Sequence, residues 1–219
     1  MLAALFVIAA PTLPEIVARA AAVLSHTPTH AVCRAETEQM RLGKRGAIEM
    51  RERAAFVRTF LGAAFSDSAP TLRWKDEQAL SPEQVSTING RAMNKNGETL
   101  DEQLRSPLVH PERHDFERVG EDTLWGHAVY VVKVTAKTPQ GANGTVWIDA
   151  TSFVERKGEL TPQQAPAHID SLSWQEQFEA LADGSVVRSL IHIEGRGHFL
   201  FFTAATRFNE RLFECAVAP

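Results

Sequence analysis

The chain lacks the sequence features that most often mark an enzyme or a nucleic-acid-binding protein. Its 219 residues carry 23 Lys and Arg against 27 Asp and Glu, a formal net charge of −4. No basic excess points to nucleic acid, and no polybasic run points to an anionic membrane surface. The sequence has no G-x-S-x-G elbow and no H-E-x-x-H motif. Gly195-Arg196-Gly197 lacks the Lys-Ser/Thr sequel of a phosphate loop. We therefore expect no catalytic residue and no cofactor.

Cysteine is also scarce. The two cysteines, Cys33 and Cys215, lie far apart and do not have the spacing of a metal site. In an oxidising compartment they could pair and close a very long loop. The alternative is two buried thiols, because free cysteine is among the most buried residue types. The sequence alone leaves both alternatives open.

Long hydrophobic runs are missing as well. Residues 2–10 form a short apolar run that is too short to span a bilayer as a helix. Its length suits the apolar core of a secretory signal, with Val7-Ile8-Ala9 as a small-residue cleavage site, although a preceding basic segment is missing. We expect an exported protein with a truncated signal or apolar arm at 1–10 and a single domain at 11–219.

Two segments carry helix-start signals. Thr12-Leu13-Pro14-Glu15 is a capping-box pattern with an early proline, and it predicts a helix to about Ser25. Ser81-Pro82-Glu83-Gln84 predicts a second, short helix over residues 81–88, which Asn89-Gly90 should end.

The rest of the chain has mainly the period of β-strands. Residues 30–42 and 47–60 flank a Gly43–Gly46 turn and predict a long hairpin. A helix over 47–60 is the alternative, because Glu, Met, Arg and Ala are good helix formers. Further strands are predicted at 115–124, 127–137, 145–150, 153–160, 171–181, 186–195, 198–208 and 210–217.

Turn signals separate these later strands: Gly120-Glu121-Asp122, Pro139-Gln140-Gly141, Asp149-Ala150-Thr151-Ser152, Asp183-Gly184 and Gly195-Arg196-Gly197. Asn143-Gly144-Thr145 matches a glycosylation sequon, and we interpret it as a hairpin turn. Strands joined by such short links must be antiparallel, because a parallel crossover needs a dozen or more residues. The sequence therefore predicts an antiparallel meander.

Alternation places apolar side chains on one face of this sheet and polar ones on the other. With few helices, the apolar face must curl on itself or be covered by the helices near 13–25 and 81–88, which favours an apolar cavity. The aromatic run at 198–202 fits either a buried core strand or a cavity wall for an acyl chain. The predicted ligand-binding, cavity-lining residues are Tyr130, Val132, Val134, Val146, Ile148, Leu172, Trp174, Phe178, Ile191, Ile193, Phe199 and Phe201.

One pair of histidines has metal-ligand spacing. His110 and His114 are four residues apart, with Glu112 and Asp115 nearby. A metal-dependent enzyme is one hypothesis for them. A solvated loop is the other, because a metal site needs three or four ligands placed together. We assign no metal ligand here.

Three motifs resemble one protein family. "GTVWIDATSFVERKGEL" (144–160) resembles the G-x-(L/V)-W-I-D…V-x-R-x-E-G hairpin of the LolA-like superfamily of periplasmic outer-membrane lipoprotein carriers and sorting proteins. "DFERVGEDTLWGHAVYVVKVTAKTP" (115–139) is similar to the strand pair that precedes this hairpin, and "NKNGETL" (94–100) to the turn before the long polar connection. The motif match covers about residues 90–215, whereas residues 61–90 differ from the usual long hairpin.

The resemblance implies a fold and a function. The fold would be mainly β (α+β), a curved antiparallel sheet forming an incomplete half barrel, with an N-terminal helix and a short lid helix. The function would be non-enzymatic binding in the bacterial envelope, with acyl chains of lipids or lipoproteins as ligands and an envelope receptor as partner. An alternative is an envelope-stress sensor or interaction module of the same fold, without a stable ligand.

Overall fold

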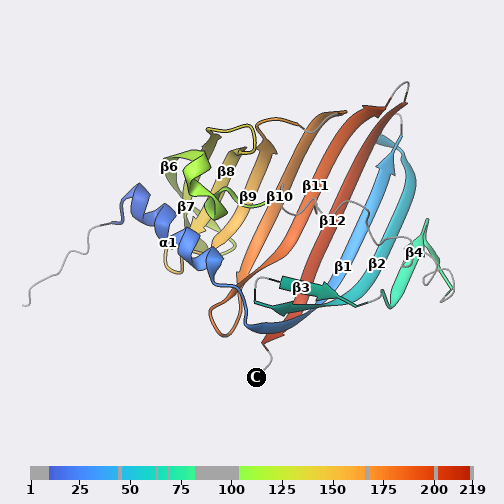
Figure 1. Ribbon diagram of the computed structural model, residues 1–219, viewed down its shortest axis with the longest axis horizontal. Helices are drawn as coiled ribbons and strands as arrows, with labels where there is room; N and C mark the ends of the chain where they lie inside the picture. The colour runs from blue at the N-terminus through green and yellow to red at the C-terminus, as the bar shows by residue number, and fades with distance from the viewer. Residues whose placement is uncertain are drawn as a thin grey trace, which may run out of the picture.

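The computed structural model describes residues 10–43, 46–62, 64–68, 70–81, 104–165, 168–199 and 202–217. Its strands are β1 (His30–Leu42), β2 (Ile48–Leu61), β3 (Ala64–Asp67), β4 (Leu72–Lys75), β5 (Gln78–Ala79), β6 (His114–Leu124), β7 (His127–Ala136), β8 (Ala142–Asp149), β9 (Glu155–Pro162), β10 (Ile169–Ala180), β11 (Val186–Phe199) and β12 (Phe202–Val217). They form one antiparallel sheet in the order β5-β4-β2-β1-β12-β11-β10-β9-β8-β7-β6, with β3 paired to β2 (Figure 1). The mainly β fold class with a curved antiparallel sheet is confirmed, and the sheet is not closed into a barrel.

The N-terminal helix α1 (Leu13–Ser25) begins and ends where the sequence predicts. Glu15 Oε2 accepts hydrogen bonds from the Thr12 backbone N at 2.7 Å and from Thr12 Oγ1 at 2.9 Å. This is the capping-box arrangement in which the third helical residue reaches back to the N-cap. The predicted lid helix at 81–88 lies outside the described residues apart from Ser81, and so does the predicted signal run apart from Ala10. No helix in the described part of the chain is long and apolar enough to cross a membrane.

The first hairpin of the chain pairs with the last strand. The predicted hairpin is confirmed as β1 and β2, and the helical alternative for 47–60 is wrong. β1 also pairs with β12, so the first strand lies beside the last (Figure 1). Cys33 on β1 and Cys215 on β12 form a disulfide across a sequence separation of 182 residues. Of the two alternatives that the sequence left open for these cysteines, the structure therefore shows the disulfide.

The meander is confirmed, but three of the predicted turns lie inside strands. Gly120-Glu121-Asp122 lies inside β6, beside an irregularity between Arg118 and Gly120, and the turn falls at Trp125-Gly126 instead. Gly195-Arg196-Gly197 lies inside β11 and pairs with β12. A Cβ on Gly197 would be 2.5 Å from His168 O. Here glycine permits a close approach of two backbones.

The Asn143-Gly144-Thr145 segment is likewise a strand and not a hairpin turn. It lies in β8 and pairs with β9. A Cβ on Gly144 would be 2.0 Å from Glu159 O, and its φ is +150°, so only glycine fits. The predicted strand at 210–217 and residues 202–208 of the one predicted at 198–208 lie in a single strand, β12, whereas His198 and Phe199 end β11.

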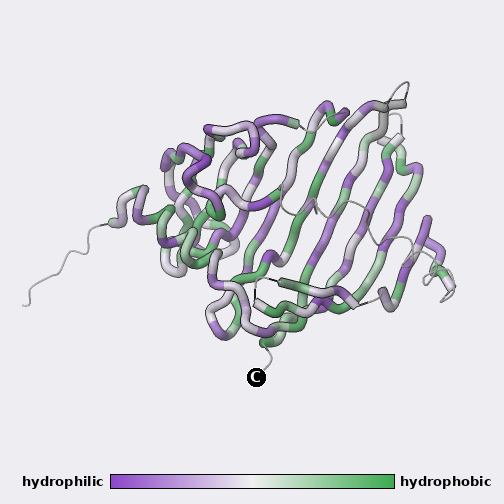
Figure 2. Tube along the Cα trace, viewed as in Figure 1, coloured by the Kyte–Doolittle hydropathy of each residue, from purple (hydrophilic) through white to green (hydrophobic). Residues whose placement is uncertain are grey.

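The core lies on one side of the sheet. We call the side that carries Val132, Val146, Trp174 and Ile191 the core face, and the opposite side the outer face. Helix α1 and the one-turn helix η2 (Pro107–Val109) lie against the core face near β6–β9 (Figure 1). A second 3₁₀ turn, η3 (Pro111–Arg113), leads into β6. Figure 2 shows hydrophobic and hydrophilic residues mixed along the strands, as expected for a sheet with one buried face.

Candidate functional site

Most of the predicted cavity-lining residues belong to one buried cluster on the core face. Eight of them are at most 7% exposed: Tyr130, Val132, Val134, Val146, Ile148, Trp174, Ile191 and Ile193. Leu172 packs against the cluster, and Phe178 is partly buried. The side chain of Phe199 and the whole of Phe201 lie outside the described structure.

Strand register brings these residues together. Tyr130 is opposite Ile148, and Val132 is opposite Val146. Trp174 pairs with Ile193 on one side and with Leu160 on the other. Directly opposed residues of antiparallel strands point to the same face. An apolar band therefore runs from β7 to β11, and complete burial of each aliphatic side chain contributes about 1.5–3 kcal/mol.

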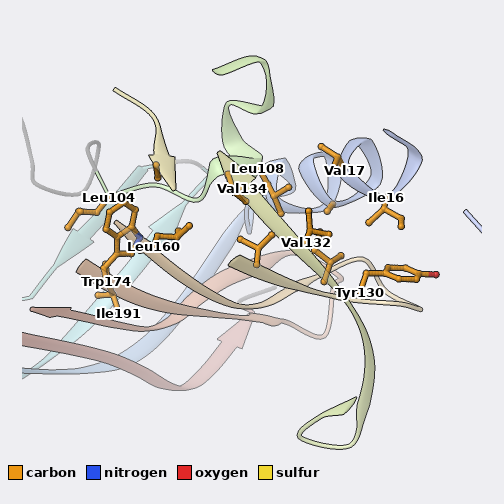
Figure 3. Close-up of a cluster of buried hydrophobic side chains, with 14 of the residues drawn as sticks. Ile16, Val17, Leu104, Leu108, Tyr130, Val132, Val134, Leu160, Trp174 and Ile191 are labelled. Atoms are coloured by element: carbon orange, nitrogen blue, oxygen red, sulfur yellow. The ribbon is translucent and has the colours of Figure 1, made fainter. Parts of the chain in front are cut away.

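In the described part of the chain, one helix and one short segment cover this apolar band. Helix α1 contributes Ile16, Val17 and Ala20, and the segment 104–109 contributes Leu104 and Leu108. Figure 3 shows the α1 and η2 side chains on one side of the cluster and the strand side chains on the other. This helix and this segment bury the apolar face of the sheet, as a second sheet does in a β-sandwich.

Two buried glutamates interrupt the apolar face, and the sequence analysis missed both. Glu155 and Glu176 are fully buried. Ser106 Oγ donates a hydrogen bond to Glu155 Oε2. Burial and the charge of Glu176 raise the pKa of Glu155 well above its usual range, against the effect of the Ser106 hydrogen bond. The sequence signal that could have predicted burial of Glu176 is its position two residues after Trp174, because residues two apart in a strand point to the same face.

The acidic residue of the "WID" motif has a structural role. Asp149 Oδ1 accepts hydrogen bonds from the backbone N of Thr151 and of Ser152, both at 2.9 Å. Arg156 donates to Asp149 Oδ2 from Nε at 3.1 Å and from Nη2 at 3.0 Å. Burial opposes ionisation of Asp149, but these backbone bonds and Arg156 lower its pKa to about 2. The hairpin motif therefore holds the β8–β9 turn closed.

His110 and His114 do not form a shared metal site. The buried His114 ring lies 3.0 Å from His110 O through Nδ1, and its Nε2 accepts a hydrogen bond from Ala142 N at 3.0 Å. His110 Nδ1 lies 3.4 Å from a Glu112 carboxylate oxygen. The described residues contain no group of three His, Cys, Asp or Glu placed to hold a metal ion. With both ring nitrogens engaged by the backbone, His114 fixes the start of β6 against β8.

A hollow of about 440 Å³ lies on the outer face where β9 and β10 pair. It is lined by Asn143, Gly144, Glu159, Leu160, Thr161, Ser173, Trp174, Gln175, His192 and Glu194. Most of these residues are polar, whereas the core face carries a cluster of buried apolar side chains, so the core face is the better candidate for an apolar ligand.

Comparison with known proteins gives similar structures of low sequence identity. No family model and no curated protein matches the chain. A putative outer membrane lipoprotein-sorting protein domain from Vibrio parahaemolyticus is similar with a TM-score of 0.44 and 13% identity, over 91% of each chain. A LolA superfamily protein from Nitrosomonas europaea has a TM-score of 0.37 and 11% identity, over 96% of this chain and 95% of its own. MucB, in the MucA/MucB complex from Pseudomonas aeruginosa, has a TM-score of 0.29 and 11% identity, over 91% and 93%.

Proposed function

We propose that this chain is a non-enzymatic binding protein of the bacterial envelope that holds the acyl chain of a lipid or lipoprotein against the core face. The observation that carries this proposal is the apolar band itself, which in the described part of the chain is covered by α1 and by a short segment that contributes Leu104 and Leu108. An acyl chain gains about 0.8 kcal/mol for each CH₂ group that it buries. A chain of ordinary length therefore compensates for the displacement of two leucine side chains.

The disulfide supports a location in the periplasm. Disulfides persist in oxidising compartments such as the periplasm and are rare in the cytosol. The Cys33–Cys215 bond therefore agrees with export, as does the apolar run at 2–10. We propose a periplasmic location, a single domain at 11–219 and an envelope receptor that exchanges the ligand.

A specific observation also favours a second candidate. Val132, Val146 and Ile148 are completely buried by the protein itself. A core filled in this way fits an envelope sensor or interaction module that has no stable ligand. Such a module would use an exposed surface, for example a sheet edge, to bind its partner.

Native mass spectrometry distinguishes the two candidates. The protein is purified from its own envelope fraction without detergent, weighed in its native state and then extracted with solvent. We expect a bound mass that extracts as a lipid or lipopeptide. A clean apo mass with no uptake of added acyl probes would contradict the carrier proposal and leave the sensor module.

A further inference from the structure

The only carboxylates that the described structure buries completely lie together under the cover of the core face. Glu155 is on β9 and Glu176 is on β10. Both side chains pass over Gly158, where a Cβ would lie 2.7 Å from Glu155 Oε1 and 3.2 Å from Glu176 Cγ. Glycine at 158 therefore makes the room that this glutamate pair needs.

The glutamate pair is connected to the segment that covers the apolar band. Ser106 is the N-cap of η2; its Oγ donates to Glu155 Oε2 and accepts a hydrogen bond from Leu108 N at 3.1 Å. Arg188 Nη1 donates to Leu104 O at 3.1 Å and lies 3.8 Å from Glu176 Oε2. The segment is thus fastened at two points, one at each glutamate.

These contacts lie where two neighbouring strands of the meander share the fewest paired residues. β9 and β10 pair only at Leu160–Trp174, Glu159–Gln175 and Gly158–Glu176. β7 and β8, by contrast, pair continuously from Val129 to Val134. Glu176 occupies the last of the three β9–β10 pairs, so a change in the charge of the glutamate pair acts where the sheet is least constrained.

The charges around the pair balance only when it holds a proton. Two ionised carboxylates in a site without solvent repel each other, and Arg188 is the cation beside them. One proton on the pair leaves a single negative charge for Arg188 to neutralise. The other charged or titratable groups near Ser106 are Arg105, His110, Arg113 and His114, which line a small hollow with it. Helix α1 and β8 contribute apolar side chains to the neighbouring cluster.

We propose that Glu155 and Glu176 form a proton-dependent latch that holds residues 104–108 on the core face. While the pair holds a proton, the Ser106 and Leu104 contacts remain in place and the apolar band is covered. When the proton leaves, the two carboxylates repel, the segment lifts and the core face opens. An acyl ligand could then enter the opened core face, and this is the one consequence that rests on the proposed function.

The direction of the pH dependence follows from burial. Burial and the neighbouring Glu176 raise the pKa of Glu155 in the closed state above its value in water, and opening the latch returns it toward that value. The closed state therefore binds the proton more tightly than the open state. Closure is favoured in acid and is lost as the pH rises through the raised pKa.

Hydrogen exchange at the Leu108 amide tests the latch without a ligand, because that N–H is bonded to Ser106 Oγ. After correction for the intrinsic exchange rate, wild-type protection should fall about tenfold per pH unit between the ordinary pKa of a solvated glutamate and the raised pKa of the closed pair, and it should level off above that raised pKa. The double variant Glu155→Gln/Glu176→Gln should remove this slope and keep the amide protected, because in Glu176→Gln alone burial would still raise the pKa of Glu155. Glu159→Gln, on the outer face where the same two strands pair, should keep the wild-type slope. If the double variant does not fold, Glu176→Gln is used, and its loss of protection should end at a lower pH than in the wild type. Protection that does not change with pH in the wild type, or a double variant with the wild-type slope, would overturn the latch.

A fluorescent fatty acid separates this proposal from the proposed function. If both are correct, probe binding strengthens with pH in the wild type and not in Glu155→Gln/Glu176→Gln. If exchange shows the latch but the probe never binds, the latch stands and the carrier proposal fails. If the probe binds equally at every pH and exchange is flat, the carrier proposal stands and the latch is overturned.

Discussion

Removing the Cys33–Cys215 disulfide should destabilise the protein by several kcal/mol. The bond closes a loop spanning a sequence separation of 182 residues. For a loop of this length, the chain-entropy model gives about 5 kcal/mol of stabilisation, all of it through the unfolded chain. In the folded state, β1 and β12 remain paired from Ala31–Val217 to Leu42–Ala205, so the reduced protein should keep its fold.

Guanidinium denaturation measures this difference. The transition is followed by tryptophan fluorescence, because Trp174 is buried and becomes exposed on unfolding. The midpoint should fall when reductant is present, and the Cys33→Ala/Cys215→Ala variant should match the reduced wild type. The m-value should rise, because the unlinked unfolded chain exposes more surface. Equal midpoints with and without reductant would refute the reasoning, as would two free thiols in the denatured, non-reduced protein.

Three further predictions concern single side chains. Burial lowers the pKa of His114, so the stability that its neutral ring provides should be present above about pH 6.5 and lost as the pH falls through the lowered value. Urea midpoints against pH should show this loss in the wild type and not in His114→Gln. Asp149→Asn should cost about 2 kcal/mol, because Arg156 loses its charged acceptor, and urea denaturation at neutral pH should show it. Gly144→Ala should cost about 3 kcal/mol, because the new Cβ meets Glu159 O, and an unchanged thermal midpoint would contradict the close approach of β8 and β9.

Local patterns predicted the parts of the fold that depend on local interactions. The Thr12–Glu15 capping box placed α1 because its hydrogen bonds lie within one turn of the chain. Alternation along β7, β8, β10 and β11 placed eight apolar residues on one face because side-chain direction in a strand has a period of two. Neither inference needed knowledge of a distant partner.

The features that were missed depend on contacts between distant residues. The pairing of β1 with β12 decides whether Cys33 and Cys215 meet, and no local pattern encodes it. Gly144 and Gly197 were interpreted as turn residues, although each one lets two backbones approach closely. Glu176 shares the register of Trp174, but its residue type argued for solvent, and only the Ser106–Glu155 contact and Arg188 explain its burial.

Photocrosslinking with a diazirine-bearing fatty acid tests the central claim most directly. The native protein is irradiated with the probe and digested, and the modified residues are identified by mass spectrometry. The account predicts crosslinks on core-face residues such as Val132, Val146 and Ile191, which disappear when unlabelled fatty acid competes. Crosslinks confined to the outer face, or none above those of the denatured protein, would contradict an acyl-binding function for the core face.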